Sequence, residues 1–246
     1  MAQSVPARLI AFLTCAVALI IGLIALAGAH RKATYHGRSL LEWRAAAFDT
    51  SAGVRDTAAY ALTRLEPASP RELAAMIRAE TVLLADDDSD VRADATSALV
   101  ALRTQSPLVV PMVAAIIDRP SSPNVRLHAI QVLAALGPDA AMAVPVVTRA
   151  LSDTNASVRL VAVTALGRLG GHGLTGDQID VVVHATTDTD ADVRAAAIEA
   201  LVALDAPHAT LLQVAERAAT DPDAGVRTEA AYALAATNRG PLTTAH

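Results

Sequence analysis

The sequence is poor in the residues from which many catalytic and cofactor sites are built. It has one cysteine, Cys15, and six aromatic residues among 246. A lone cysteine excludes a disulfide within the chain, and so few aromatic rings argue against a stacking platform for bases or flat cofactors. The seven histidines form no His-Glu, His-x-x-x-His or Glu-x-x-His pair. We therefore expect no catalytic residues, no metal and no cofactor.

Acidic residues are absent from the first 32 positions. After Lys32 the chain carries 25 acidic and 17 basic side chains, a net charge of −8. Such a field repels the phosphate backbone of nucleic acids, whose binding depends on clustered Lys and Arg. The composition thus predicts no nucleic-acid partner.

Charge of either sign is absent from residues 9–29. As a helix, these 21 residues would span roughly 30 Å at about 1.5 Å each, which matches the hydrocarbon core of a bilayer. The sequence therefore predicts a single-pass membrane protein with a tail at 1–8, a transmembrane anchor helix at 9–29 and a linker at 30–37.

A cleaved signal peptide is the alternative interpretation of the N-terminus. Ala27-Gly28-Ala29 fits the small-residue pattern for cleavage before His30. The uncharged stretch is longer than the ~7–15 residues usual for a signal peptide, which favours the anchor. Arg8 lies on one side of the stretch, with Arg31 and Lys32 on the other, so the flanking charges leave the orientation in the membrane open.

A Val-Arg dipeptide recurs six times at steps of 33 to 37 residues. Its arginines are Arg55, Arg92, Arg126, Arg159, Arg194 and Arg227. Alanine always stands three residues after the arginine and leucine seven after it. Together with apolar residues at −1 and +6, and at +10 in every unit but the last, which has Thr237, these offsets trace one face of an α-helix. A period of this length is typical of a stacked repeat.

Each of these helices, which we call helix B, follows a polar turn and an earlier apolar segment, helix A. Five turns carry an aspartate six residues before the arginine, and the third has Pro120 at that position. Asp, Asn and Ser in these turns can cap helix B. Pro111 and Pro145 fall within two predicted A helices, which they should kink.

The unit formed by Leu136-Gly137-Pro138-Asp139, Val144-Pro145, Leu151-Ser152-Asp153, Val158-Arg159 and Ala165-Leu166 resembles a HEAT repeat. The resemblance implies an all-α fold, a right-handed α-solenoid of about six helix pairs over residues 38–242. Because fold does not determine function, the resemblance leaves the activity open.

Some enzymes also contain HEAT-like repeats. Deoxyhypusine hydroxylases bind iron through His-Glu dipeptides, which this chain lacks. Alkylpurine DNA glycosylases need a basic, aromatic surface, which the charge disfavours. Bilin lyases remain the alternative, so the chain could be a lyase or an enzyme-accessory subunit.

Two further motifs have structural explanations. The run Asp188-Thr189-Asp190-Ala191-Asp192 resembles the start of an EF-hand loop, but Val193 occupies the sixth position, where the loop needs glycine. The glycine-rich segment 167–177 lacks the Gly-Lys-Ser/Thr of a P-loop and follows a helix. We interpret the repeat arginines as structural too, each bonded to its own turn or to a neighbour's turn.

The exposed side of helix B is the candidate binding surface, because its residues vary from unit to unit. The predicted partner-binding residues are Tyr60, Asp94, His128, Gln131, Thr164, Glu199, Glu229 and Tyr232. The sequence therefore favours a non-catalytic, membrane-anchored scaffold that binds protein partners through the concave surface of its B helices.

Overall fold

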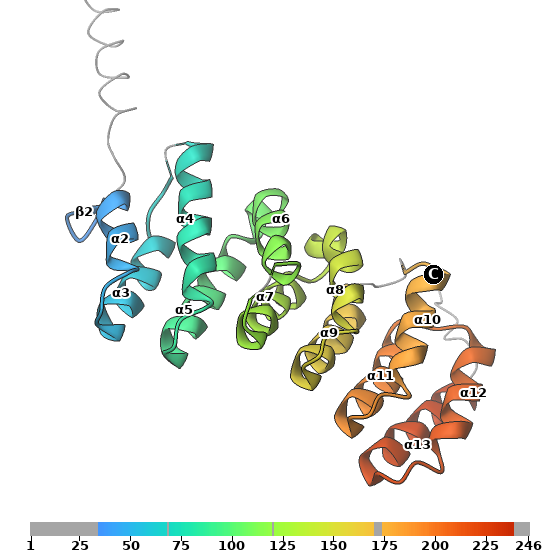
Figure 1. Ribbon diagram of the computed structural model, residues 1–246. Coiled ribbons are helices and arrows are strands. Elements are labelled where there is room, and N and C mark those ends of the chain that lie inside the picture. Colours follow the sequence, from blue (N-terminus) through green and yellow to red (C-terminus); the bar gives the residue numbers. More distant parts are fainter. Residues whose placement is uncertain (1–33, 68, 120, 170–173, 239–246) are drawn as a thin grey trace, which may run out of the picture.

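The computed structural model describes residues 34–67, 69–119, 121–169 and 174–238. The predicted tail, the anchor at 9–29 and the alternative cleavage site before His30 lie outside the described residues. Within them the chain forms helix pairs stacked side by side (Figure 1). This arrangement confirms the predicted α-solenoid.

The A and B helices alternate along the chain. The A helices are α2 (Leu40–Ala46), α4 (Pro70–Leu83), α6 (Ser106–Ile117), α8 (Val144–Ala150), α10 (Gly176–Ala185) and α12 (His208–Ala218). The B helices are α3 (Ala52–Thr63), α5 (Ser89–Ala101), α7 (Pro123–Leu136), α9 (Ala156–Leu169), α11 (Ala191–Ala203) and α13 (Ala224–Asn238). Two short 3₁₀ helices, η1 (Arg103–Gln105) and η2 (Gly137–Ala143), precede α6 and α8.

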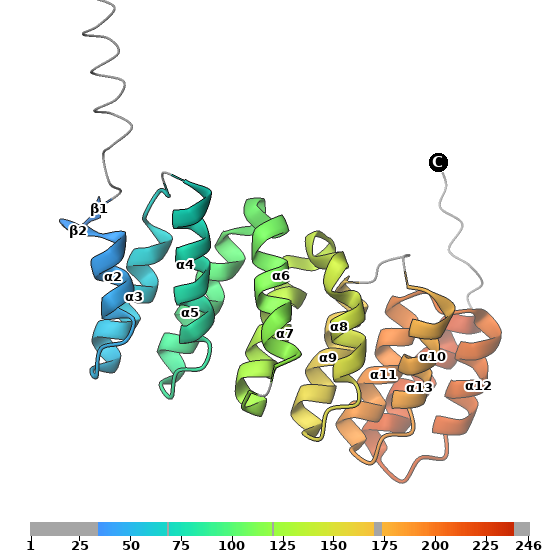
Figure 2. The same ribbon diagram turned by 45° about the horizontal axis from the view of Figure 1, so that its top comes forward.

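The two sets of helices form two rows, which both ribbon views show (Figures 1 and 2). Neighbouring B helices pack against each other more closely than neighbouring A helices do. The alanine three residues after each repeat arginine is small enough to permit this close approach. These alanines are completely buried: Ala58, Ala95, Ala129, Ala162, Ala197 and Ala230. The row of B helices is therefore the more tightly packed of the two rows.

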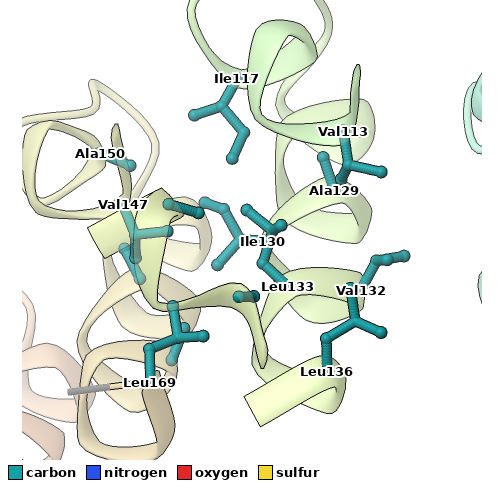
Figure 3. Close-up of a cluster of buried hydrophobic side chains, with 14 of the residues drawn as sticks. Val113, Ile117, Ala129, Ile130, Val132, Leu133, Leu136, Val147, Ala150 and Leu169 are labelled. Atoms are coloured by element: carbon teal, nitrogen blue, oxygen red, sulfur yellow. The ribbon is translucent and has the colours of Figure 1, made fainter. Parts of the chain in front are cut away.

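The core runs without a break from one unit to the next. Ile130 and Leu133 of α7 point toward Val147 of α8 (Figure 3). The leucines at +7 are fully buried in units one to five, and Leu234 of the last unit is half-buried. Leu234 is more exposed because no further unit in the described part of the chain covers α13.

The two prolines differ in their effect. Pro111 lies inside α6, as predicted. Pro145 is instead the second residue of α8, because this helix begins only at Val144 and the preceding residues form η2. In the first turn of a helix the missing N–H of proline costs no hydrogen bond. The predicted kink at Pro145 is therefore wrong, and the proline marks the start of the helix.

A two-stranded hairpin precedes α2 and begins within residues 30–37, for which the sequence predicts only a linker. Strands β1 (Thr34–Tyr35) and β2 (Arg38–Ser39) pair antiparallel. The turn residues His36 and Gly37 have φ angles of 47° and 75°, as a type I′ turn requires. The indole N–H of Trp43 donates to the carbonyl oxygen of Tyr35 at 3.0 Å, which fastens the hairpin to α2.

Candidate functional site

Arginines at the start of the B helices tie neighbouring units together. In four units, Nε and Nη2 of the arginine donate to the two carboxylate oxygens of the aspartate in the polar turn of the following unit. The nitrogen–oxygen distances are 2.5–2.9 Å. We call these four the joint pairs: Arg55–Asp86, Arg126–Asp153, Arg159–Asp188 and Arg194–Asp221. The fork of guanidinium donors fits a carboxylate in two places, which sets orientation as well as distance.

Each joint arginine also holds its own turn. Nη1 of Arg194, for example, donates to the carbonyl oxygen of Asp188 at 3.0 Å. The partner aspartate shapes its turn in the same way, since Oδ1 of Asp188 accepts from the backbone N–H of Asp190 at 2.9 Å. The hydrogen bond from Arg159 is the main cause that lowers the pKa of Asp188. These contacts join one polar turn to the next along the solenoid.

The EF-hand-like run is part of this turn chemistry. The carboxylate of Asp190 accepts from the backbone N–H groups of Asp192 and Val193 and so caps α11. Among the described residues, no group of three or more His, Cys, Asp or Glu side chains is arranged to hold a metal ion. In the glycine-rich segment, residues 170–173 lie outside the described part, and Thr175 begins α10 with a capping box.

The joint between units two and three is different because Pro120 replaces the aspartate. Nε of Arg92 donates to Nε2 of His128 at 3.2 Å, and Nδ1 of His128 lies 3.0 Å from Oε1 of Gln131. This network requires a neutral imidazole that carries its proton on Nδ1. Burial lowers the pKa of His128, and the charge of Arg92 lowers it further, against the opposite effect of Gln131.

We expect this joint to weaken in acid. The folded-state pKa of His128 lies below its ordinary value of 6.5, so its stabilising contribution is present above that pH and is lost as the pH falls through the folded-state pKa. Urea unfolding at about pH 7.5 and about pH 5.5 should show a larger loss of stability in the wild-type chain than in His128→Gln. The exposed His184→Gln is the control and should behave like wild type; equal losses in all three chains would contradict the expectation.

The second unit contains a buried carboxyl group that was not among the residues predicted from the sequence. Glu80 of α4 is 1% exposed, and neither of its carboxyl oxygens has a hydrogen-bond partner among the described residues. Burial raises the pKa of Glu80 well above its ordinary value, and the charge of Asp94 raises it further. Burial and Asp94 also raise the pKa of Asp56.

The repeat itself contained the signal for Glu80. Glu80 stands twelve residues before the repeat arginine of its unit. In each of the five other units this position holds an apolar residue: Trp43, Ala114, Val147, Val182 and Ala215. Four of these five are buried in the core, and Ala114 is half-buried. Glu80 thus occupies a core position of the repeat.

The predicted binding residues divide into two groups by their position on helix B. All six side chains five residues after the arginine are exposed: Tyr60, Ser97, Gln131, Thr164, Glu199 and Tyr232. We call these six the B-face row, since they recur at one position on successive B helices. The side chains two residues after the arginine, Asp94, His128 and Glu229, are half-buried. The B-face row is therefore the accessible part of the predicted surface.

The first tyrosine of the B-face row is partly engaged within its own unit. The hydroxyl of Tyr60 accepts a hydrogen bond from Nη2 of Arg64 at 2.7 Å, and the guanidinium lies 4.9 Å from the centre of the ring. The rings of Tyr60 and Tyr35 are 6.3 Å apart. Tyr232, in the last unit, is 58% exposed.

Comparison with known proteins bears on the architecture. The model for the HEAT repeat family matches residues 109–202 and 179–243, which together are more than half of the chain. A search of curated proteins finds no match.

Solved structures resemble the described solenoid. An engineered protein is 20% identical with a TM-score of 0.54, and the match covers 82% of this chain and 97% of that one. A chain in the structure of the complex of CpcE and CpcF of phycocyanin lyase from Nostoc sp. PCC7120 is 26% identical with a TM-score of 0.55, and the match covers 65% of this chain and 98% of that one. The karyopherin Kap121p, bound to the extreme C-terminus of the phosphatase Cdc14p, is 13% identical with a TM-score of 0.63, covering 80% and 25%. At this identity, the first and third show the fold alone.

Proposed function

The chain belongs to the HEAT repeat family, and we propose that it is a non-catalytic scaffold that binds protein partners through the concave surface of its B helices. The observation that carries the proposal is the B-face row, six exposed side chains at one position of the repeat. Solenoids commonly bind along such an extended inner surface. The joint pairs hold successive units in a set orientation, so the row presents a preformed surface.

The chemistry of the B-face row suits a polypeptide. Tyr60 and Tyr232, 44% and 58% exposed, offer aromatic surface of the kind that dominates binding energy in protein interfaces. Between them lie the amide of Gln131, the hydroxyl of Thr164 and the carboxylate of Glu199. These groups can exchange hydrogen bonds with a peptide backbone or with polar side chains.

Binding through this surface can be tested by capture from cells. The full-length chain carrying Gln131→Lys, Glu199→Lys and Tyr232→Lys should lose the proteins that the wild-type chain captures. The matched control carries Val82→Lys, Leu108→Lys and Met142→Lys, which change exposed side chains of the A-helix row and its connections, and it should retain them. Circular dichroism verifies that both variants are folded. Capture unchanged by the first set would refute the proposal.

We also propose that residues 9–29 anchor the chain as a single membrane-spanning helix. The length and the lack of charge of this run support it. The protein should stay in the membrane fraction after extraction with alkaline carbonate, and its mature N-terminus should precede His30. A soluble chain that begins at His30 would establish the cleaved signal peptide instead. Protease treatment of intact cells then shows on which side the solenoid lies.

The likeness to the phycocyanin lyase complex supports a second candidate, a bilin-lyase-like subunit. The matching chain of that complex is 26% identical to this one, and the match covers 98% of that chain and 65% of this one. The full-length chain would be purified after expression with and without a bilin-producing system, and the absorbance of bound pigment would be measured. A scaffold should be colourless in both cases. A stoichiometric pigment, or transfer of pigment to an acceptor protein, would favour the lyase.

A further inference from the structure

The first helix of the solenoid has apolar residues on two opposite sides. Trp43 and Ala47 of the α2 region are buried against the rest of the unit, 4% and 2% exposed. On the other side, Leu41, Ala45 and Phe48 follow one another at steps of four and three residues, and all three are exposed. Leu41 is 72% exposed and Phe48 66%, the two highest values among the large apolar side chains of the described residues.

These three residues form one stripe, which we call the α2 stripe. Residues i, i+4 and i+7 lie on one face of a helix, and Phe48 continues the last turn because its backbone N–H donates to the carbonyl oxygen of Ala45 at 3.1 Å. A terminal repeat normally presents a polar outer face to water. The α2 stripe does the opposite, so it needs a covering surface.

The charges around the α2 stripe are positive. Residues 31–48 contain four basic side chains and one acid, Glu42, whereas residues 49–246 carry 15 basic and 24 acidic side chains. The carboxylate of Glu42 is held by Ser39, whose backbone N–H and hydroxyl both donate to it at 2.7 Å. Arg44 lies in the last turn of α2. The exposed Arg38 lies just before the helix, with its guanidinium 5.0 Å from the centre of the Trp43 ring. The N-terminal end of the solenoid thus combines exposed apolar side chains with a local positive charge.

We propose that the α2 stripe, with Arg38 and Arg44, docks on an anionic lipid bilayer and holds the first unit against the membrane surface. Shallow insertion of Leu and Phe next to basic residues is the usual chemistry of interfacial helices. The inference rests on the proposed anchor. Only five peptide steps separate Ala29 from Thr34, about 17 Å at full extension, so an anchor ending at Ala29 brings the hairpin and α2 to the bilayer surface.

A second copy of the chain fits the α2 stripe less well. In a two-fold dimer the same patch meets itself, which would bring Arg38 and Arg44 of one copy near those of the other. Like charges at such a contact repel. Anionic headgroups, in contrast, complement both arginines while the stripe enters the acyl boundary.

The test places a fluorescent probe in the stripe of the full-length chain. In a Cys15→Ala background, Ala45→Cys is labelled with the polarity-sensitive dye NBD and reconstituted into phosphatidylcholine vesicles with phosphatidylserine. We expect emission at shorter wavelength, and quenching by spin-labelled lipid. The matched probe at Tyr232→Cys, exposed at the far end of the solenoid, should show neither. Adding Leu41→Ser and Phe48→Ser, or Arg38→Glu and Arg44→Glu, should abolish the shift at position 45.

The outcomes separate docking from anchoring. If the chain resists carbonate extraction but its probes at positions 45 and 232 emit at the same wavelength, the anchor is supported and the docking proposal is refuted. A blue-shifted probe at 45 that spin-labelled lipid does not quench identifies a protein occupant, either a second copy or another part of the chain, and also overturns docking. A chain that carbonate removes from the vesicles refutes the anchor, and docking with it.

Discussion

Glu80→Met should raise the stability of the protein at neutral pH. A buried polar group without a hydrogen-bond partner costs about 1–3 kcal/mol, and Glu80 is such a group among core side chains. Methionine has a similar length and fills the same space with apolar atoms. Urea unfolding of the full-length chain in detergent, followed by far-UV circular dichroism, measures the change. The exposed Glu216→Met serves as the control and should leave the midpoint almost unchanged.

The effect of Glu80 should depend on pH in a defined direction. Its folded-state pKa lies well above the ordinary value of 4.5, so the folded chain retains a proton that the unfolded chain releases. Its contribution to stability is present below about pH 4.5 and is lost as the pH rises through the folded-state pKa. The advantage of Glu80→Met over wild type should therefore grow as the pH rises from 4.5. A constant difference across this range would show that Glu80 does not change protonation on unfolding.

Asp188→Ala should destabilise the protein much more than Asp118→Ala. Both aspartates accept two hydrogen bonds from an arginine of another unit, Arg159 and Arg149. The side chains of the first pair are 13% and 12% exposed, and those of the second 61% and 52%. Loss of charged hydrogen bonds in the sheltered pair should cost about 1–3 kcal/mol, whereas exposed pairs contribute about 0–1 kcal/mol.

The same experiment tests the role of the joint pairs in coupling the units. In a repeat protein, stability is the sum of the unit terms and of the interfaces between neighbours. A weakened interface between units four and five should broaden the unfolding transition of Asp188→Ala as well as shift it. Arg159→Met should produce the same broadening, and the double variant little more, because the two residues act as one pair. Additive effects of the two substitutions would show that they act independently.

The fold could be predicted in considerable detail because its determinants are local and repeated. The alanine three residues after the repeat arginine and the leucine seven residues after it lie on one helical face. In the structure that face is the buried one. The capping residues of the turns are local as well, since Asp190 bonds to amides two and three residues ahead. In the candidate site, the exposure of the B-face row could be predicted from the same helical period, because position +5 lies off the apolar face. The hairpin could not be predicted, because strands of two residues are too short to show an alternating pattern.

The sequence by itself determined the helices, their buried faces and the number of units, because a helical period and a cap are properties of a few neighbouring residues. Only the tertiary structure decided which groups meet between units. It paired Arg159 with an aspartate 29 residues away, gave Arg92 an imidazole instead, and buried Glu80 without a partner. It also turned the α2 stripe outward. These outcomes depend on how successive helix pairs are stacked, and a charged or apolar side chain looks the same in the sequence whether or not a neighbour covers it.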